Sequence, residues 1–93
     1  MIRIHVWISG HVQGVGFRAS LFREVSRFPQ IVGYVCNLED GRVEALFQGP
    51  ESDVKTLVAW CQQGPSHAHV EQVDTQTERV GSEWTSFQVR RSP

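Results

Sequence analysis

The sequence lacks any apolar run that approaches the roughly 18 residues needed by a membrane-spanning helix. Its first residues, Met1 to Ile4, begin a strand-like alternation and do not have the form of a signal peptide. These two absences exclude a helical membrane protein. We therefore expect no membrane partner and a cytoplasmic location.

A surplus of charge of either sign is also absent. Nine Lys and Arg stand against ten Asp and Glu, which gives a formal net charge of −1. A near-neutral chain exerts no long-range attraction on nucleic acid or on an acidic membrane. No nucleic-acid partner is expected, and any anion site must be built locally from a few donors.

Cysteine is scarce, since only Cys36 and Cys61 are present. Two cysteines are too few for a disulfide scaffold or an iron–sulfur cluster, and their spacing does not match a zinc site. We expect two free thiols, as in a reducing compartment. His67 and His69 are placed on one face of a predicted strand, but no third ligand accompanies them, so no metal site is expected.

Regular patterning runs through the whole chain, and we expect a single domain over 1–93. Helical spacing of apolar residues predicts helices over 18–28 and 51–63. Alternation of apolar and polar residues predicts strands over 2–9, 31–38, 42–48, 67–76 and, as a last short strand, 84–90. Val70 and Val73 break the alternation and indicate a bulge.

The order of these elements is β-α-β-β-α-β with an extra short C-terminal strand. This order predicts the α+β, ferredoxin-like sandwich, in which an antiparallel sheet carries both helices on one face. Cys36 is then expected on the face away from the helices, and Cys61 in the core beneath the second helix. On opposite sides of the sheet, the two thiols cannot form a bond.

A glycine-rich segment, 10–17, joins the first strand to the first helix. Backbone N–H groups can converge at such a place, and the helix N-terminus adds positive partial charge. Arg18 follows on the first turn, where a cation is unfavourable by about 0.3–1 kcal/mol unless an anion is bound beside it. Arginine also grips phosphate with two parallel hydrogen bonds. The pattern predicts a phosphate-sized anion site, against the alternative of a surface arginine beside a flexible loop.

Better-known phosphate motifs are excluded by this loop. The P-loop ends in Gly-Lys-Ser/Thr, whereas this segment ends in Gly16-Phe17-Arg18. A thiol phosphatase needs a cysteine at the start of its loop, where this sequence has Val12. The loop can therefore bind an anion but carries no nucleophilic side chain, so any attack on a bound phosphate group must come from water.

Asn37 is the second candidate site residue. By alternation it shares the helix-covered face of the sheet with Val35, near the end of its strand and just before the turn Glu39-Asp40-Gly41. An amide there is either a buried hydrogen-bond anchor or a group aimed at a ligand. The residues alone leave both interpretations open.

Two long stretches resemble the signatures of the acylphosphatase family. Gly10-His11-Val12-Gln13-Gly14-Val15-Gly16-Phe17-Arg18 resembles the family's loop, and 33–44 resembles its second signature. Pro65, the stretch 68–73 and the closing 87–90 are also similar to the family, so the resemblance covers essentially the whole chain. It implies a ferredoxin-like fold and hydrolysis of acyl phosphates to a carboxylate and inorganic phosphate, without metal or cofactor.

The resemblance also implies which residues act. The family's phosphate-binding arginine falls on Arg18, and its water-positioning asparagine falls on Asn37. Its main-chain phosphate loop falls on Val12, Gln13, Gly14, Val15, Gly16 and Phe17. The expected partners are small-molecule acyl phosphates and the product phosphate, with little discrimination among acyl groups, and the expected state is a monomer.

Two rival functions share this fold. RNA-recognition domains have the same element order, but the basic and aromatic pattern that reads RNA is missing here. A non-catalytic or regulatory acylphosphatase-like domain that binds phosphate or carbamoyl phosphate, as in carbamoyl-transfer maturation proteins, stays open. Because the chain ends at Pro93, just after the predicted domain closes, we favour a free-standing enzyme.

Overall fold

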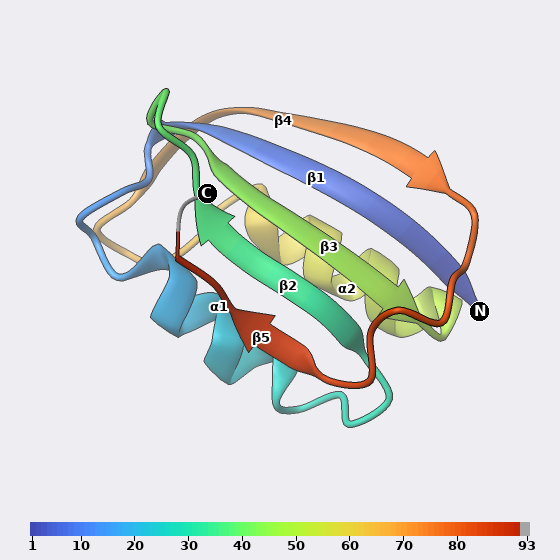
Figure 1. The fold of residues 1–93 in the computed structure, drawn as a ribbon. Coiled ribbons are helices and arrows are strands. Elements are labelled where there is room, and N and C mark those ends of the chain that lie inside the picture. The colour runs from blue at the N-terminus through green and yellow to red at the C-terminus, as the bar shows by residue number, and fades with distance from the viewer. Residues whose placement is uncertain (92–93) are drawn as a thin grey trace.

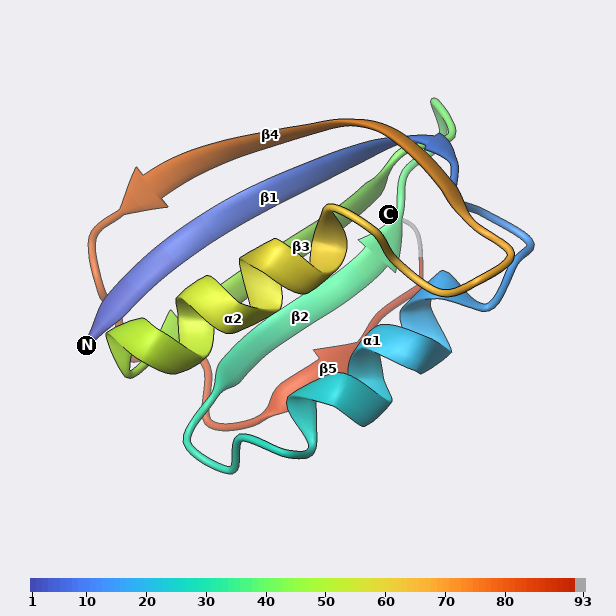
Figure 2. The same ribbon diagram turned by 180° about the vertical axis from the view of Figure 1, so that it is seen from behind.

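Two helices lie against one face of a five-stranded sheet in a computed structural model that describes residues 1–91 (Figures 1 and 2). The sheet order is β4-β1-β3-β2-β5. The elements are β1 (Ile2–His11), α1 (Phe17–Val25), β2 (Val32–Asn37), β3 (Val43–Gly49), α2 (Glu51–Cys61), β4 (His69–Glu78) and β5 (Phe87–Val89). The predicted ferredoxin-like arrangement is confirmed.

The pairing directions match the prediction except at one edge. β1 pairs antiparallel with β3 and β4, and β2 pairs antiparallel with β3. β5 instead pairs parallel with β2, so the expectation of an antiparallel sheet is wrong for this last strand. The reason is where β4 ends: the chain crosses that end of the sheet and runs back in the direction of β2 (Figure 1).

Several boundaries differ from those predicted. β1 continues through Gly10 and His11, which pair with β4 beyond a register shift, and that shift is the bulge predicted between Val70 and Val73. α1 covers Phe17–Val25 rather than 18–28, because the chain after it tightens into a turn. β4 begins at His69, so His67 lies in a turn and the two histidines do not share a strand face as predicted.

The main core lies between the sheet and the helices. From the helices, Leu21, Leu57 and Cys61 are fully buried in it. The sheet contributes Val6, Ile8, Val35, Val43, Ala45 and Phe47, which are also fully buried. This core fixes the start of α1 against the ends of β1 and β2, which run in the same direction on either side of β3 (Figure 1).

Part of the opposite face of the sheet is covered by the segment that follows β4. Tyr34 and Leu46 alternate with the core residues of β2 and β3, and both are buried on this face in a small second cluster. The Trp84 ring lies 5.1 Å from the Tyr34 ring, and the Arg90 guanidinium lies 5.2 Å above the same ring. Tyr34 therefore lies under other side chains and is not an open ring of the kind on which RNA-recognition domains stack bases.

The two cysteines lie on opposite faces of the sheet, as predicted. Cys36 belongs to the second cluster and Cys61 to the main core, and both are free thiols. Burial, with a hydrogen bond to Glu44, raises the pKa of the Cys36 thiol to about 11. Burial alone raises the pKa of Cys61 to about 12. Both side chains are therefore neutral and unreactive near neutral pH.

Gly33 is the position where the fold depends most on the absence of a side chain. Its φ is 138°, and a Cβ there would lie 1.8 Å from the Leu46 carbonyl oxygen. We expect Gly33→Ala to lower the free energy of unfolding by about 3 kcal/mol, measured by urea denaturation. Gly41→Ala is the control, because its φ is 97° but no atom lies within 4 Å of the added Cβ. If the two variants lose equal free energy of unfolding, the contact between position 33 and the Leu46 carbonyl does not decide the effect.

Candidate active site

The loop between β1 and α1 is anchored at both ends by buried side chains. Val12 and Phe17 are each only 1% exposed, and the Phe17 ring packs edge-on against Trp60 with 5.4 Å between ring centres. Val15 packs partly against the same core. Because these side chains turn inward, the loop presents mainly its backbone to the outside.

Two glycines shape that backbone. Gly14 and Gly16 have φ values of 75° and 77°, and Gly16 caps α1 without a side-chain hydrogen bond. No atom lies within 4 Å of where a Cβ would stand on either residue, so the space beside them is open. Within residues 1–91, the N–H groups of 13–16 donate to no backbone carbonyl. Such groups at a helix N-terminus are suited to an anion.

The Gln13 side chain ties this loop to the turn between β2 and β3. Its amide nitrogen donates to the Leu38 carbonyl at 2.7 Å and to the Arg42 carbonyl at 2.9 Å. The sequence placed Gln13 in the loop for its main chain only, and this role of its side chain was missed. The tie fixes the loop beside Asn37, the residue that precedes Leu38.

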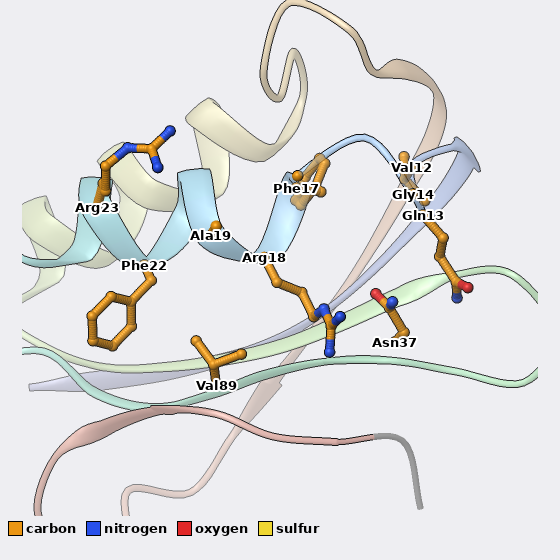
Figure 3. Close-up of a pocket in the computed structure, with 11 residues that line it drawn as sticks. Val12, Gln13, Gly14, Phe17, Arg18, Ala19, Phe22, Arg23, Asn37 and Val89 are labelled. Atoms are coloured by element: carbon orange, nitrogen blue, oxygen red, sulfur yellow. The ribbon is translucent and has the colours of Figure 1, made fainter.

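Arg18 stands on the first turn of α1 and extends toward β2 (Figure 3). Its guanidinium makes one long contact, 3.5 Å to the Arg90 carbonyl oxygen. In the part of the chain that the structure describes, it forms no ion pair with a carboxylate. An arginine held over a cleft in this way is suited to an anionic ligand.

Asn37 is the last residue of β2 and lies beside Arg18 in the cleft (Figure 3). It is on the helix-covered side of the sheet, as the alternation predicted. β1 and β2 finish at the same end of the sheet, and α1 starts just after β1. The fold therefore brings Arg18 and Asn37 together.

A cleft of about 540 Å³ contains these groups. It is lined by Val12, Gln13, Gly14, Gly16, Phe17, Arg18, Ala19, Phe22, Arg23, Asn37 and Val89 (Figure 3). Every predicted site residue except Val15 is among them. The lining includes two arginines and, within residues 1–91, no carboxylate, so the cleft favours an anion although the whole chain is slightly acidic.

Four lining residues were not predicted from the sequence. Ala19, Phe22 and Arg23 lie on α1, where the helical spacing places Phe22 beside the buried stripe of Leu21 and Val25. Phe22 is 44% exposed, which helical spacing alone does not reveal. Val89 comes from β5, and no local pattern indicates that this strand borders the cleft.

The other candidate residues stand apart from the cleft. His11, His67 and His69 are all exposed. Among residues 1–91, no three His, Cys, Asp or Glu side chains are grouped so that they could hold a metal ion. Neither described helix is long and apolar enough to span a membrane.

Comparison with known proteins gives a match over most of the chain. The family profile of acylphosphatases matches residues 4–89. The acylphosphatase of Roseiflexus sp. (strain RS-1) is 53% identical over 89 residues, which are 96% of this chain and 95% of that protein. The crystal structure of acylphosphatase from Bacillus subtilis has a TM-score of 0.89 at 30% identity, over 97% of this chain and 99% of that one.

A larger protein contains a region of similar fold. The structure of full-length HypF in the phosphate- and nucleotide-bound form gives a TM-score of 0.86 at 23% identity. The match covers 98% of this chain but only 12% of HypF. At this identity the likeness concerns the fold alone, and it does not favour the regulatory-domain alternative.

Proposed function

This chain belongs to the acylphosphatase family, and from that premise we propose how its cleft hydrolyses an acyl phosphate. Hydrolysis yields a carboxylate and inorganic phosphate. One observation carries the mechanism: Arg18, Asn37 and the open glycine loop line the same cleft. Arg18 forms no ion pair with a carboxylate of the described residues.

The phosphoryl group is held by the loop and Arg18. The N–H groups of 13–16 donate to its oxygens from one side, and the guanidinium donates from the other. In the transition state, negative charge spreads over the equatorial oxygens of the transferring group. Donors already fixed by Val12, Phe17 and the Gln13 tie stabilise this charge without rearranging.

Asn37 positions the attacking water. The water oxygen forms a bond to phosphorus while the bond from phosphorus to the acyl oxygen breaks, and the acyl oxygen keeps the electron pair. A carboxylate is a good leaving group, so no strong acid is needed to protonate it. The proton released by the water passes to the phosphate product or to solvent. The amide of Asn37 serves to hold the water in line.

The activity is tested directly with the purified chain and benzoyl phosphate, whose hydrolysis is followed by its loss of ultraviolet absorbance. We propose that Arg18 and the backbone supply the positive charge that a metal ion would otherwise provide. We therefore expect kcat/KM to be unchanged in excess EDTA, and added Mg²⁺ not to raise it. A rate lost in EDTA and restored by Mg²⁺ would contradict metal independence.

We also propose that the protein acts as a monomer, because the loop, Arg18 and Asn37 meet in one cleft and the proposed mechanism needs no residue from a second copy. Light scattering after size-exclusion chromatography should give the mass of one chain, 10.6 kDa; a dimer mass would contradict this.

A cytoplasmic location is supported by the two free thiols, which are typical of a reducing compartment.

A further inference from the structure

The cleft has two chemically different ends. Around Arg18 and Asn37 it is polar, whereas Ala19, Phe22 and Val89 form an apolar wall at the other end (Figure 3). Phe22 is 44% exposed and Val89 is 46% exposed. In residues 1–91 the only other exposed large apolar side chains are Met1 and Val80, so half of this group gathers in one cleft. Exposed apolar side chains grouped in a groove are typical of a ligand site.

The direction of the reaction points to the ligand group that meets this wall. Attacking and leaving oxygens lie roughly in line on opposite sides of phosphorus. Figure 3 shows the Arg18 guanidinium between Asn37 on one side and Val89 and Phe22 on the other. A water positioned by Asn37 therefore drives the leaving acyl group toward Phe22 and Val89.

The apolar surface continues beyond Phe22. A second hollow of about 140 Å³ shares this residue with the cleft. Its lining is almost entirely apolar: Phe22, Val25, Ser26, Phe28, Pro29, Ile31 and Phe87. The rings of Phe22 and Phe87 are 6.5 Å apart. An acyl chain that passes Phe22 thus meets further apolar surface.

Arg23 does not change the character of this end. It lines the cleft, but its guanidinium donates to the Ser20 hydroxyl oxygen at 3.1 Å. In Figure 3 it is turned away from the side of α1 that carries Phe22. The wall itself offers no cation to a charged acyl tail.

We propose that Ala19, Phe22 and Val89 form an acyl-binding subsite, and that the preferred substrates are acyl phosphates with an aliphatic chain or an aromatic ring. The inference rests on the proposed mechanism, which orients the substrate. It modifies the expectation of little discrimination among acyl groups: the wall is open on one side, so it gives a graded preference rather than strict selection.

The test compares kcat/KM for acetyl, hexanoyl, benzoyl and succinyl phosphate. In the wild type, we expect hexanoyl phosphate to exceed acetyl phosphate about tenfold, because the two carboxylates are nearly equal leaving groups and partial burial favours the longer chain. Benzoyl phosphate should also react faster, with a contribution from its more acidic leaving group. Phe22→Ser should reduce the ratio of hexanoyl to acetyl phosphate to about one. Val80→Ser is the matched control, since Val80 is 42% exposed but lies outside both hollows, and it should keep the wild-type ratio.

If Phe22→Ser keeps the wild-type ratio of kcat/KM for hexanoyl over acetyl phosphate, the proposed subsite is wrong. A preference for succinyl over hexanoyl phosphate would also overturn it, because this would indicate that Arg23 binds a carboxylate. Calorimetric binding of methylphosphonate and hexylphosphonate separates this proposal from the mechanism. If the wild type hydrolyses nothing but binds hexylphosphonate more tightly, and Phe22→Ser does not, the mechanism fails and the subsite stands. If hexylphosphonate has no advantage, the subsite fails.

Discussion

Replacing Arg18 with alanine is expected to lower kcat/KM for benzoyl phosphate by about 10²–10³-fold, the usual effect of removing one fixed donor to a developing charge. Arg18 is not buried, and among residues 1–91 its guanidinium donates one long hydrogen bond, to the Arg90 carbonyl oxygen, so its loss should leave the fold intact. Steady-state kinetics gives the rate, and calorimetry with inorganic phosphate should show that phosphate binding is weakened as well.

Two further variants separate charge from geometry. Arg18→Lys keeps the positive charge but loses the paired donors, so its rate should fall between wild type and Arg18→Ala. Arg27→Ala removes an exposed arginine just after α1 that forms an ion pair with Glu24 and does not line the cleft, and it should keep the wild-type rate. Near-normal activity in Arg18→Ala would reject the proposed role of this residue.

Asn37→Ala is expected to reduce kcat by about 10²-fold while the affinity for inorganic phosphate changes little. A water displaced by about 1 Å from the line of attack costs a rate factor of this size. The phosphate oxygens would still meet the loop and Arg18, so binding is retained. Rapid-mixing kinetics on benzoyl phosphate, with calorimetry on phosphate, measures the two effects separately.

The opposite pattern has a different meaning. If Asn37→Ala raises KM and leaves kcat unchanged, the amide binds the phosphate rather than the water. Thermal unfolding of the variant provides the control, because Asn37 ends β2 and has contacts that also contribute to the fold. A large drop in melting temperature would require the kinetics to be repeated well below it.

Local patterns were sufficient for most of the fold. The strands and both helices follow from side-chain periodicity, and the position of Asn37 on the helix side follows from alternation with Val35. The bulge in β4 was visible because Val70 and Val73 cannot share a face in a regular strand. The loop and Arg18 are adjacent in sequence, so the cradle was also a local feature.

Features that depend on distant parts of the chain could not be predicted in this way. The Gln13 amide reaches carbonyls 25 and 29 residues away, and no spacing rule connects them. Tyr34 and Leu46 alternate as outward residues, but the irregular segment around Trp84 covers them. The parallel pairing of β5 depends on which end of the sheet β4 reaches, which its three residues do not encode.

The double hydrogen bond from Gln13 has a thermodynamic consequence for each turnover. It joins the loop that we propose binds the phosphate to the strand end that we propose positions the water, which restrains the two from moving independently. The entropy cost of aligning these two surfaces is therefore largely met when the chain folds, and not again in each cycle. In the proposed mechanism, each catalytic cycle then starts from a preorganised pair of surfaces.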